Sequence, residues 1–296
     1  MQNISGRTVF ITGGAQGIGL GMARAFTTAG AKVAVADVDE TALDQAVAEL
    51  ATLSGRPDDA SGHVLDVRDR DAFARAVDEA EEAHGPVAVL CTNAGLGSIA
   101  SLDELTWAHW DLVLGTNLGG VVNGIQTVVP RMIARGGPGH IVNTASGAGL
   151  IASPNLTYAT SKFAVVGLSE SLRQQPELTG SGIGVSVLCP GYVATDVIRN
   201  SARREGSEDD PRVDIAHTLL SGQGVQPDAV GRQVLAAVQQ GELYVLTDRY
   251  IEPVLRERFQ LLQDAMPPET ERDREIAPSL ATRLATLVPP VVGAAR

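Results

Sequence analysis

A tyrosine and a lysine four positions apart, Tyr158 and Lys162, have the residue types and the spacing for acid–base chemistry. In a helix, residues four apart lie on one face, so the phenol and the ammonium can point at a common spot. A nearby cation stabilises the phenolate and moves the pKa of a tyrosine from about 10 towards neutral pH. The tyrosine could then exchange a proton with an alcohol or a carbonyl. The spacing alone leaves a second interpretation open, in which the pair is a packed ring and a solvated amine.

The composition of the 296-residue chain limits what can surround this pair. The length suits one large α/β domain or two small ones. The chain is 44% hydrophobic and 20% charged, with 32 glycines, which is ordinary for a globular protein rich in tight turns. A net charge of -12 argues against nucleic acid or an anionic membrane as a partner, because both need a basic surface. We therefore expect any anionic ligand to be held by local groups.

Two features of the sequence bear on its location in the cell. The first residues contain no basic stretch followed by an apolar run, and no segment approaches eighteen consecutive apolar residues. Cys91 and Cys189 each end a short apolar run, which suits buried thiols in a reducing compartment better than a disulfide. These features predict a cytoplasmic protein without a secretory signal or a membrane-spanning helix.

A glycine-rich segment, residues 13–19, lies between a predicted buried strand at 8–12 and a predicted helix that begins near Gly17. Glycines let the backbone approach a bulky anion, and the free N–H groups at a helix start can hold a pyrophosphate. The segment therefore predicts a dinucleotide site. The alternative is a glycine-rich turn without a ligand.

Asp37 ends the second predicted strand, residues 32–36, about twenty residues beyond the glycines. A carboxylate there can accept hydrogen bonds from both adenosine ribose hydroxyls and repels a 2′-phosphate. Neither Gln16 nor Val38 is the cation expected beside such a phosphate. We therefore predict NAD rather than NADP. The alternative is that Asp37 caps the next helix, a role that Asp39 could fill instead.

Strand and helix patterns alternate along the chain, with further strands predicted near residues 62–65, 87–91, 140–144, 185–189 and 243–247. This spacing implies parallel strands joined by right-handed crossovers. The predicted fold class is α/β, a doubly wound parallel sheet (Rossmann fold) of about seven strands with helices on both faces. The fourth strand leads to Asn93, Ala94 and Gly95, at the carboxyl edge where such sheets bind ligands.

These motifs together resemble the short-chain dehydrogenase/reductase family over about residues 5–250. The matching residues are, in order, the segment 12–19, Asp66-Val67, Asn93-Ala94-Gly95, Asn117, Ser146, Tyr158 with Lys162, and Pro190-Gly191 followed by Thr195. The resemblance implies an NAD-dependent alcohol dehydrogenase or ketoreductase, which transfers a hydride between NAD(H) and a secondary alcohol or ketone. It implies that the cofactor is held by Gly13, Gln16, Gly17, Ile18, Gly19, Asp37, Asp66, Val67, Asn93, Ala94, Gly95, Tyr158, Lys162, Pro190, Gly191, Val193 and Thr195.

The resemblance also implies a role for each of four catalytic residues. Tyr158 is expected to be the general acid/base, and Lys162 to lower its pKa and bind the nicotinamide ribose. Ser146 would hydrogen-bond the substrate oxygen, and Asn117 would hold a water that links Lys162 to solvent. The nicotinamide carries the hydride chemistry, so no metal is needed. From the residues alone, Ser146 could instead cap a turn and Asn117 could bond only to backbone in its own helix.

The last third of the sequence departs from the common pattern. We expect residues 1–250 to form one catalytic domain, in which the polar segment at about 197–224 is a mobile lid over the substrate or, alternatively, a disordered insertion. Its arginines 199, 203 and 204 could meet an anionic substrate or be neutralised by neighbouring acidic residues. Residues 251–296 are expected to form an amphipathic helix and a tail that pack on the domain or on a partner subunit.

Residues 122–125 and 129–133, with the carboxyl-terminal extension, look like a branch of dehydrogenases for benzylic alcohols of lignin-type aryl ethers. This likeness implies a bulky or aromatic small-molecule substrate. A long helical region is predicted over residues 107–135, and its glycines 115, 119, 120 and 124 suggest close packing against another helix, in this chain or in a second subunit. We expect a homo-oligomer, either a dimer or a tetramer. Other substrates stay open on this scaffold: a steroid, a sugar alcohol or an acyl chain. A dinucleotide-sensing protein without turnover is the non-enzymatic alternative. The predicted substrate pocket consists of Leu96, Gly97, Ala148, Ile151, Tyr192 and Val193.

Overall fold

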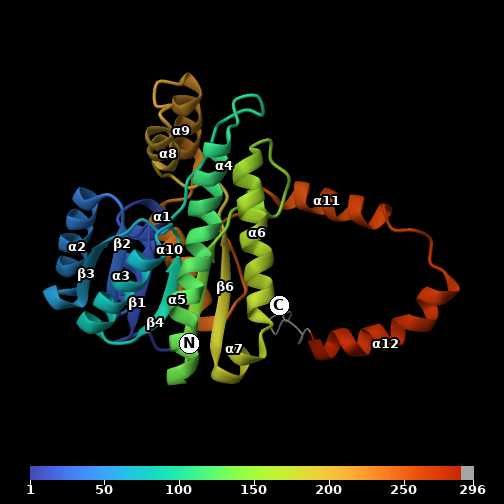
Figure 1. The fold of residues 1–296 in the computed structure, drawn as a ribbon, viewed down its shortest axis with the longest axis horizontal. Helices are drawn as coiled ribbons and strands as arrows, with labels where there is room; N and C mark the ends of the chain where they lie inside the picture. The colour runs from blue at the N-terminus through green and yellow to red at the C-terminus, as the bar shows by residue number, and fades with distance from the viewer. Residues whose placement is uncertain (288–296) are drawn as a thin grey trace.

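The computed structural model describes residues 1–287, with side chains to residue 280, and has a seven-stranded parallel sheet at its centre (Figure 1). The strand order is β3-β2-β1-β4-β5-β6-β7, so the direction of winding reverses between β1 and β4. This confirms the predicted doubly wound fold. The strands are β1 (Thr8–Thr12), β2 (Lys32–Asp37), β3 (Ala60–Val64), β4 (Val87–Thr92), β5 (Gly139–Thr144), β6 (Ile183–Cys189) and β7 (Tyr244–Leu246).

Helices cover both faces of the sheet. On β1, Val9 and Ile11 contribute to one core cluster and Phe10 to the other, as the alternation of side chains along a strand requires. Because both faces are buried there, the central strands β1 and β4 are nearly continuous apolar runs. The first cluster includes residues of α1 (Gly17–Thr28), α2 (Glu40–Ser54) and α10 (Pro227–Gln240). The second includes residues of α3 (Arg70–His84) and α5 (Gly120–Arg135), and buried valines of α6 (Leu156–Arg173) belong to a third cluster on β6.

The helical region predicted for residues 107–135 is interrupted by one π-helical turn. It consists of α4 (Trp107–Leu114), the π turn η2 (Gly115–Gly119) and α5. Among the described residues, this is the one helical stretch long and apolar enough to span a membrane, and 56% of its most apolar window is buried in the domain. Burial of this kind is typical of a core helix in a globular protein.

The glycines of α5 pack against the sheet layer and, at one position, against a neighbouring helix. A Cβ on Gly124 would lie 2.8 Å from Cγ2 of Thr92 in β4. A Cβ on Gly120 would lie 2.6 Å from Cγ2 of Val67, just after β3. A Cβ on Gly124 would also lie 3.1 Å from Cζ of Phe73 in α3. The expected helix–helix contact is therefore confirmed at Gly124, whereas Gly120 meets the loop after β3. Because they have no side chain, these two glycines let the start of α5, and the π turn before it, lie close to the carboxyl edge of the sheet.

The segment predicted as a lid forms two helices, α8 (Val197–Glu205) and α9 (Pro211–Gln223), so the disordered alternative is wrong. Both stand at the carboxyl edge of the sheet (Figure 1). The periodicity of the sequence also missed the short α7 and two 3-10 turns. These are α7 (Pro176–Ser181), η1 (Pro57–Asp59) and η3 (Gly147–Gly149).

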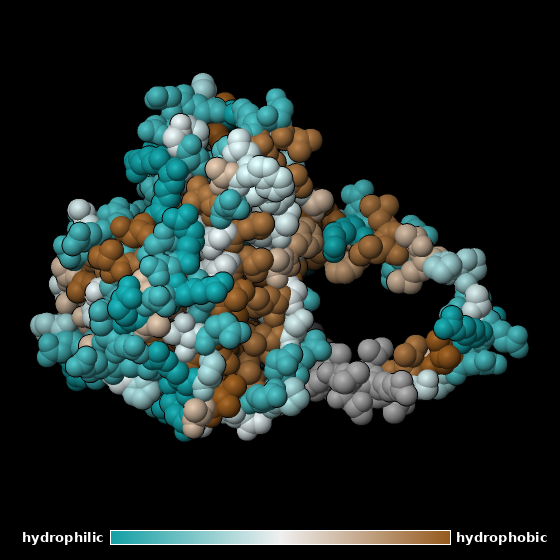
Figure 2. Space-filling model, viewed as in Figure 1, coloured by the Kyte–Doolittle hydropathy of each residue, from teal (hydrophilic) through white to brown (hydrophobic). Residues whose placement is uncertain are grey.

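Two carboxyl-terminal helices, α11 (Glu252–Asp264) and α12 (Glu271–Leu287), extend from the domain as an arm (Figure 1). No residue of α11 is buried, and Phe259 and Leu262 are 54% and 50% exposed. Apolar side chains lie along the surface of both helices (Figure 2). The contact of α11 with α6 that the structure records places the Arg258 guanidinium 5.1 Å from the Phe163 ring centre. The predicted helix therefore does not bury its apolar residues on its own domain, and the end of the predicted tail, 288–296, lies outside the described residues.

Candidate active site

A cavity of about 1010 Å³ lies at the carboxyl edge of the sheet, between the strand ends and helix α8. It is lined by every predicted cofactor and catalytic residue except Gly19 and Asn117. All six residues predicted for the substrate pocket line it as well. Segments that follow each of the seven strands thus meet around one space, as expected at the switch point of a doubly wound sheet.

The glycine turn between β1 and α1 has a shape that side chains would fill. Gly13 and Gly17 have φ of 61° and 52°, which favour glycine. A Cβ on Gly19 would lie 1.9 Å from the carbonyl oxygen of Gly13, so Gly19 packs behind the turn rather than lining the cavity. The N-cap residue of α1, Gln16, makes no capping hydrogen bond with its side chain. The amide groups at the start of α1 are therefore suited to an anion, and the turn fits the diphosphate of a dinucleotide.

Asp37 lines the cavity at the end of β2 and holds the neighbouring backbone. Its carboxylate accepts hydrogen bonds from the amides of Val38 at 2.8 Å, Asp39 at 3.3 Å and Ala15 at 3.3 Å. The helix cap of α2 is Asp39, which accepts from the Ala42 amide at 3.0 Å. The interpretation of Asp37 as the helix cap is therefore wrong, and its carboxylate is fixed beside the glycine turn.

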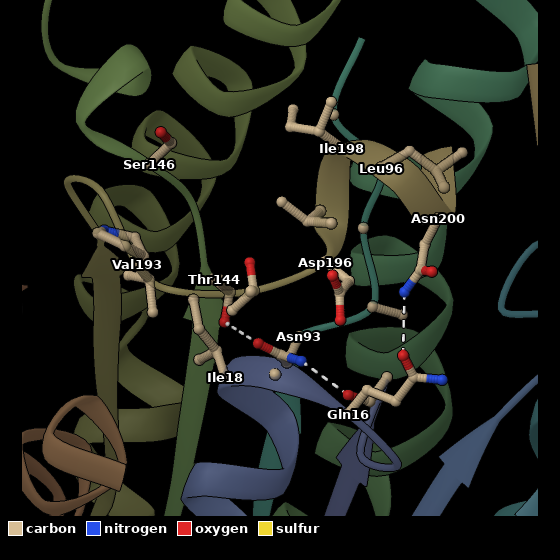
Figure 3. Close-up of a pocket in the computed structure, with 18 of the residues that line it drawn as sticks. Gln16, Ile18, Asn93, Leu96, Thr144, Ser146, Val193, Asp196, Ile198 and Asn200 are labelled. Atoms are coloured by element: carbon tan, nitrogen blue, oxygen red, sulfur yellow. Dashed lines mark hydrogen bonds between the residues drawn. The ribbon is translucent and has the colours of Figure 1, made fainter. Parts of the chain in front are cut away.

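Asn93, beyond β4, ties three strand ends together. Its amide nitrogen donates to the carbonyl oxygens of Thr12 at 3.2 Å and Gly13 at 3.1 Å. Its carbonyl oxygen accepts from the Thr144 hydroxyl at 3.2 Å (Figure 3). The side chain thus positions the glycine turn relative to β5.

Asp66 and Val67 follow β3 on the same edge. Val67 is buried, and the Asp66 carboxylate forms an ion pair with Arg68 at 2.6 Å. The hydrogen bond from Arg68 holds the pKa of the Asp66 carboxyl below its usual range. Asp66 is therefore ionised at neutral pH and already has a cationic partner.

Tyr158 and Lys162 face one spot, with the Lys162 ammonium 5.6 Å from the centre of the Tyr158 ring. Lys162 is 4% exposed, and its Nζ donates to the carbonyl oxygen of Thr144 at 3.0 Å. Burial lowers the pKa of Lys162 to about 8. Burial also raises the pKa of Tyr158, although a hydrogen bond from Ser146 opposes this shift. Lys162 does not contribute to this shift, so the expectation that its charge lowers the Tyr158 pKa stays a prediction.

Ser146 precedes the 3-10 turn η3 and has two hydrogen-bonding partners. Its Oγ accepts from the Ala148 amide at 3.1 Å, so the prediction of a turn cap holds. The same hydroxyl is hydrogen-bonded to Tyr158. Ser146 is thereby held beside the phenol, where a substrate oxygen could meet both hydroxyls.

Asn117 lies in the π turn and is fully buried. Its amide accepts from the Leu96 N–H at 2.7 Å and donates to the Leu96 carbonyl at 2.9 Å and to Ser161 Oγ at 3.1 Å. The alternative in which Asn117 bonds only within its own helix is wrong. A π turn widens the helix by one residue, and such turns occur often at functional sites. Here it brings an amide from the α4–α5 helix against the loop after β4.

The comparison with known proteins agrees with this geometry. The family model described as short chain dehydrogenase matches residues 7–206. The chain belongs to this family. A C alpha-dehydrogenase of Sphingobium sp. (strain NBRC 103272 / SYK-6) is 36% identical over 277 residues, which cover 90% of this chain and 89% of that protein. The predicted likeness to the benzylic alcohol dehydrogenase branch is thus confirmed, and the protein is an oxidoreductase of the short-chain dehydrogenase family.

Two solved structures of short-chain dehydrogenases are similar to the whole chain. One, from Novosphingobium aromaticivorans, superposes with a TM-score of 0.80 at 36% identity, over 96% of this chain and 97% of that one. The other, from Burkholderia phymatum in complex with NAD, has a TM-score of 0.83 at 31% identity, over 91% and 99% of the two chains. The short-chain dehydrogenase fold therefore extends over nearly all of the chain.

In this short-chain dehydrogenase, helix α8 is bonded to both sides of the cavity. Asn200 donates to the side-chain oxygen of Gln16 at 3.0 Å (Figure 3). The Ser201 hydroxyl accepts from the Gly97 amide at 2.8 Å. The loop before α8 also contacts the glycine turn, since a Cβ on Gly17 would lie 3.1 Å from Cγ2 of Thr195. Helix α8 and the loop before it thus cover the cavity at the carboxyl edge of the sheet.

The three arginines of α8 do not form one cluster. Arg199 pairs with Asp214 of α9 at 3.0 Å, and Arg203 donates to Asn200 Oδ1 at 3.1 Å. Arg203 and Arg204 line the cavity, and the charge of Arg204 lowers the pKa of Asp66. Arg199 is therefore neutralised as one alternative predicted, whereas the other two arginines face the side of the cavity that holds Asp66.

Sequence reasoning missed several residues of the cavity. One signal was available for Tyr250, because an aromatic residue shortly after the seventh strand falls at the carboxyl edge of the sheet. The others come from loops and lid helices with no motif. The missed residues that line the cavity include Ser98, Ser153, Asn155, Ile198, Asn200 and Tyr250.

Proposed function

We propose that this oxidoreductase transfers a hydride between NAD(H) and a secondary alcohol or its ketone, with a bulky or aromatic substituent on the reacting carbon. The observation that carries the proposal is the meeting of Tyr158, Ser146 and Lys162 in the cavity that also contains the glycine turn. A protein that only senses a dinucleotide has no need of an acid/base group there. This argues against the non-catalytic alternative.

The cavity fits a nicotinamide dinucleotide. Side chains on the glycine turn would collide with neighbouring protein atoms, so only glycine keeps its shape, and the turn and the start of α1 line the cavity with no side-chain cap on the helix. Gly95 is another position at which a side chain would crowd the site, because a Cβ there would lie 3.4 Å from Lys162 Nζ. When bound, the nicotinamide supplies the hydride chemistry. The preference for NAD is supported by the Asp37 carboxylate at the cavity wall and by the related Burkholderia structure that contains NAD.

The side chains move a proton at the substrate oxygen. Ser146 donates a hydrogen bond to that oxygen, and Tyr158 takes its proton in oxidation or returns one in reduction. Lys162 places a positive charge near the phenolate that forms, which favours ionisation at that moment even though burial opposes it in the resting protein. Tyr158 is therefore a weak base at rest and depends on its neighbours to react.

Asn117 is proposed to support the proton route. Its Oδ1 and Lys162 Nζ lie 3.2 Å and 3.4 Å from the position that a Cβ of Gly95 would occupy. Both atoms thus border the same point beside Gly95, and we place a bridging water there. The proton given to Tyr158 could leave through Lys162 and this water.

The organisation and setting of the protein are part of the proposal. Residues 1–250 form the catalytic domain with a lid at about 197–224, and residues 251–296 pack on a partner subunit in a dimer or tetramer. The exposed apolar residues of α11 support the homo-oligomer. The two free, buried cysteines support the cytoplasm, and the net charge of -12 speaks against nucleic acid or a membrane as a partner.

The test is NADH formation with a panel of secondary alcohols and both cofactors. 1-Phenylethanol and a larger aryl carbinol are compared with 2-octanol, a sugar alcohol and a hydroxysteroid. We expect oxidation of the aryl carbinols with NAD, and a kcat/KM at least about 10-fold lower with NADP, since one unfavourable charge contact costs about 1.4 kcal/mol or more. A preference for NADP contradicts the role of Asp37, and turnover of the steroid or sugar alcohol alone contradicts the substrate class.

A further inference from the structure

Two tyrosines from separate parts of the chain stack at the substrate end of the cavity. The rings of Tyr192 and Tyr250 have their centres 5.0 Å apart and their planes 20° from parallel. Both side chains line the cavity, together with Tyr158 and Ser146. Tyr192 is 37% and Tyr250 51% exposed, so the pair is not part of the closed core. A stacked pair with open faces is an aromatic wall beside the acid/base residue.

The loop that carries Tyr250 is fixed to the active site by its neighbours. Ile251 is buried, and a Cβ on Gly147 would lie 3.3 Å from its Cγ2, which places it against the turn after Ser146. The Thr247 hydroxyl accepts from the Gly191 amide at 2.9 Å. The Tyr250 amide donates to Asp248 at 3.1 Å. The loop after β7 is therefore attached to the loop after β6 and to the Ser146 turn.

The electrostatics of Tyr250 agree with this placement. Burial and the neighbouring Tyr192, Asp248 and Tyr158 oxygens together raise the pKa of Tyr250. The stacked rings also leave their outer faces exposed in part. The surface that the pair offers to a ligand therefore includes aromatic ring face.

We propose that Tyr192 and Tyr250 form the aryl-binding subsite of this enzyme, on which an aromatic ring of the substrate stacks while the attached carbinol reaches Tyr158. The inference rests on the proposed function and adds the residues that select the substrate. Aromatic rings prefer offset stacking on other rings, and each such contact stabilises by about 0.5–1.5 kcal/mol beyond its buried area. The subsite therefore favours a phenyl ring over a saturated ring of the same size.

The subsite also gives the carboxyl-terminal region a part in catalysis. Tyr250 lies directly before Ile251 and helix α11, whereas the acid/base residues lie on α6 and the turn before it. The two rings come from the two loops that follow β6 and β7, neighbouring strands of the sheet. Substrate selection is thus assigned in part to Tyr250, which lies beyond the residues that the family model matches, 7–206.

The experiment compares the affinities of acetophenone and cyclohexyl methyl ketone, which differ in the aromaticity of one ring. Both are titrated by ligand-observed NMR into the full-length Tyr158→Phe protein with NADH, where turnover is suppressed. Tyr250→Leu, Tyr192→Leu and Tyr250→Phe are made in that background. Tyr244→Leu is the matched control, because Tyr244 is 42% exposed and bonded to Glu170, outside the cavity lining.

We expect Tyr250→Leu and Tyr192→Leu each to lower the phenyl-to-cyclohexyl affinity ratio by about 3- to 10-fold, and Tyr250→Phe and Tyr244→Leu to keep it. The two leucine variants lie on different loops, and their unfolding curves show whether each is folded. A ratio that is unchanged in a folded leucine variant overturns the aryl subsite. If neither ketone binds and no alcohol is oxidised by the unchanged protein, the proposed function fails and this inference fails with it. If both ketones bind but the affinity ratio does not change in Tyr250→Leu, the aryl subsite is overturned while the proposed function stands.

Discussion

The glycine turn and the carboxyl-terminal arm are opposite extremes of the same molecule. At the turn, atoms are so close that a Cβ on Gly19 would lie 1.9 Å from a backbone oxygen. In the arm, α11 has no buried residue and its apolar side chains face outward. Both segments have clear sequence patterns, a glycine motif and an amphipathic period. The glycine motif makes all of its contacts within one domain, so its sequence determines its geometry. An amphipathic helix face requires a partner that covers it but does not determine which partner.

We expect the largest effect from a substitution in the glycine turn. Gly19→Ala puts a methyl group into the Gly13 carbonyl, so the turn must open. We expect a loss of about 1–3 kcal/mol in unfolding free energy and about 100-fold in NAD affinity. Gly167→Ala is the control, because Gly167 lies in α6 with no atom within 4 Å of its added Cβ. That change is expected to stabilise by about 0.5–1 kcal/mol. Unfolding by urea and a titration of NAD measure both, and an unimpaired Gly19→Ala protein contradicts the tight turn.

A second effect concerns the charge buried in the cleft, which has no counterpart in the arm. The Lys162 pKa is about 8 in the folded protein against 10.5 in an exposed chain. The folded state therefore binds fewer protons between these values, and the unfolding free energy should rise as pH increases from 8 to 10.5. Lys162→Met should be more stable than the unchanged protein by about 2–3 kcal/mol at pH 7 and should lack this rise. Urea unfolding at pH 7, 8, 9 and 10 checks both. A Met variant that is less stable at pH 7 contradicts the cost of the buried charge.

The smallest effect is expected in the arm. Phe259→Ser with Leu262→Ser changes two half-exposed side chains of α11, so the domain should keep its unfolding free energy within about 0.5 kcal/mol. If α11 covers a partner subunit, the mass measured by light scattering should fall relative to the unchanged protein. Glu257→Ser, an exposed polar change on the same helix, should alter neither quantity. A domain destabilised by more than about 2 kcal/mol would show that the arm packs on its own domain.

Much of the fold could be predicted because the strands are buried on both faces. Strand β1 has the predicted bounds, and the other strands differ by one or two residues. Helices α8 and α9 were not predicted, since α8 is polar and acidic residues precede α9. The apolar residues of α9 are also spread around the helix instead of forming one face. Helix α8 is held by contacts with Gln16 and Gly97, and α9 by the ion pair of Arg212 with Glu104; all three partners lie far away in the sequence.

The active-site residues could be predicted where a sequence motif implies their position. Features that depend on contacts between distant parts of the chain could not be predicted. The four-residue spacing of Tyr158 and Lys162 gives their common face, but the direction of the Tyr158 pKa depends on how much water the fold removes. Asn117 was found by the family resemblance, while its π turn depends on packing around the Leu96 loop. Tyr250 needs the loop after β7 to lie on Gly191, and no local pattern shows that contact.

The central claim is that Tyr158 is the acid/base of a hydride-transferring enzyme, and the rate of NADH formation from saturating 1-phenylethanol by Tyr158→Phe tests it most directly. Phenylalanine keeps the ring and its packing but has no proton to exchange. We predict that kcat falls by about 10²- to 10⁴-fold, the usual contribution of a positioned acid/base, while NAD affinity stays within about 3-fold of the unchanged protein. A Tyr158→Phe protein that oxidises the alcohol at the unchanged rate would contradict the claim.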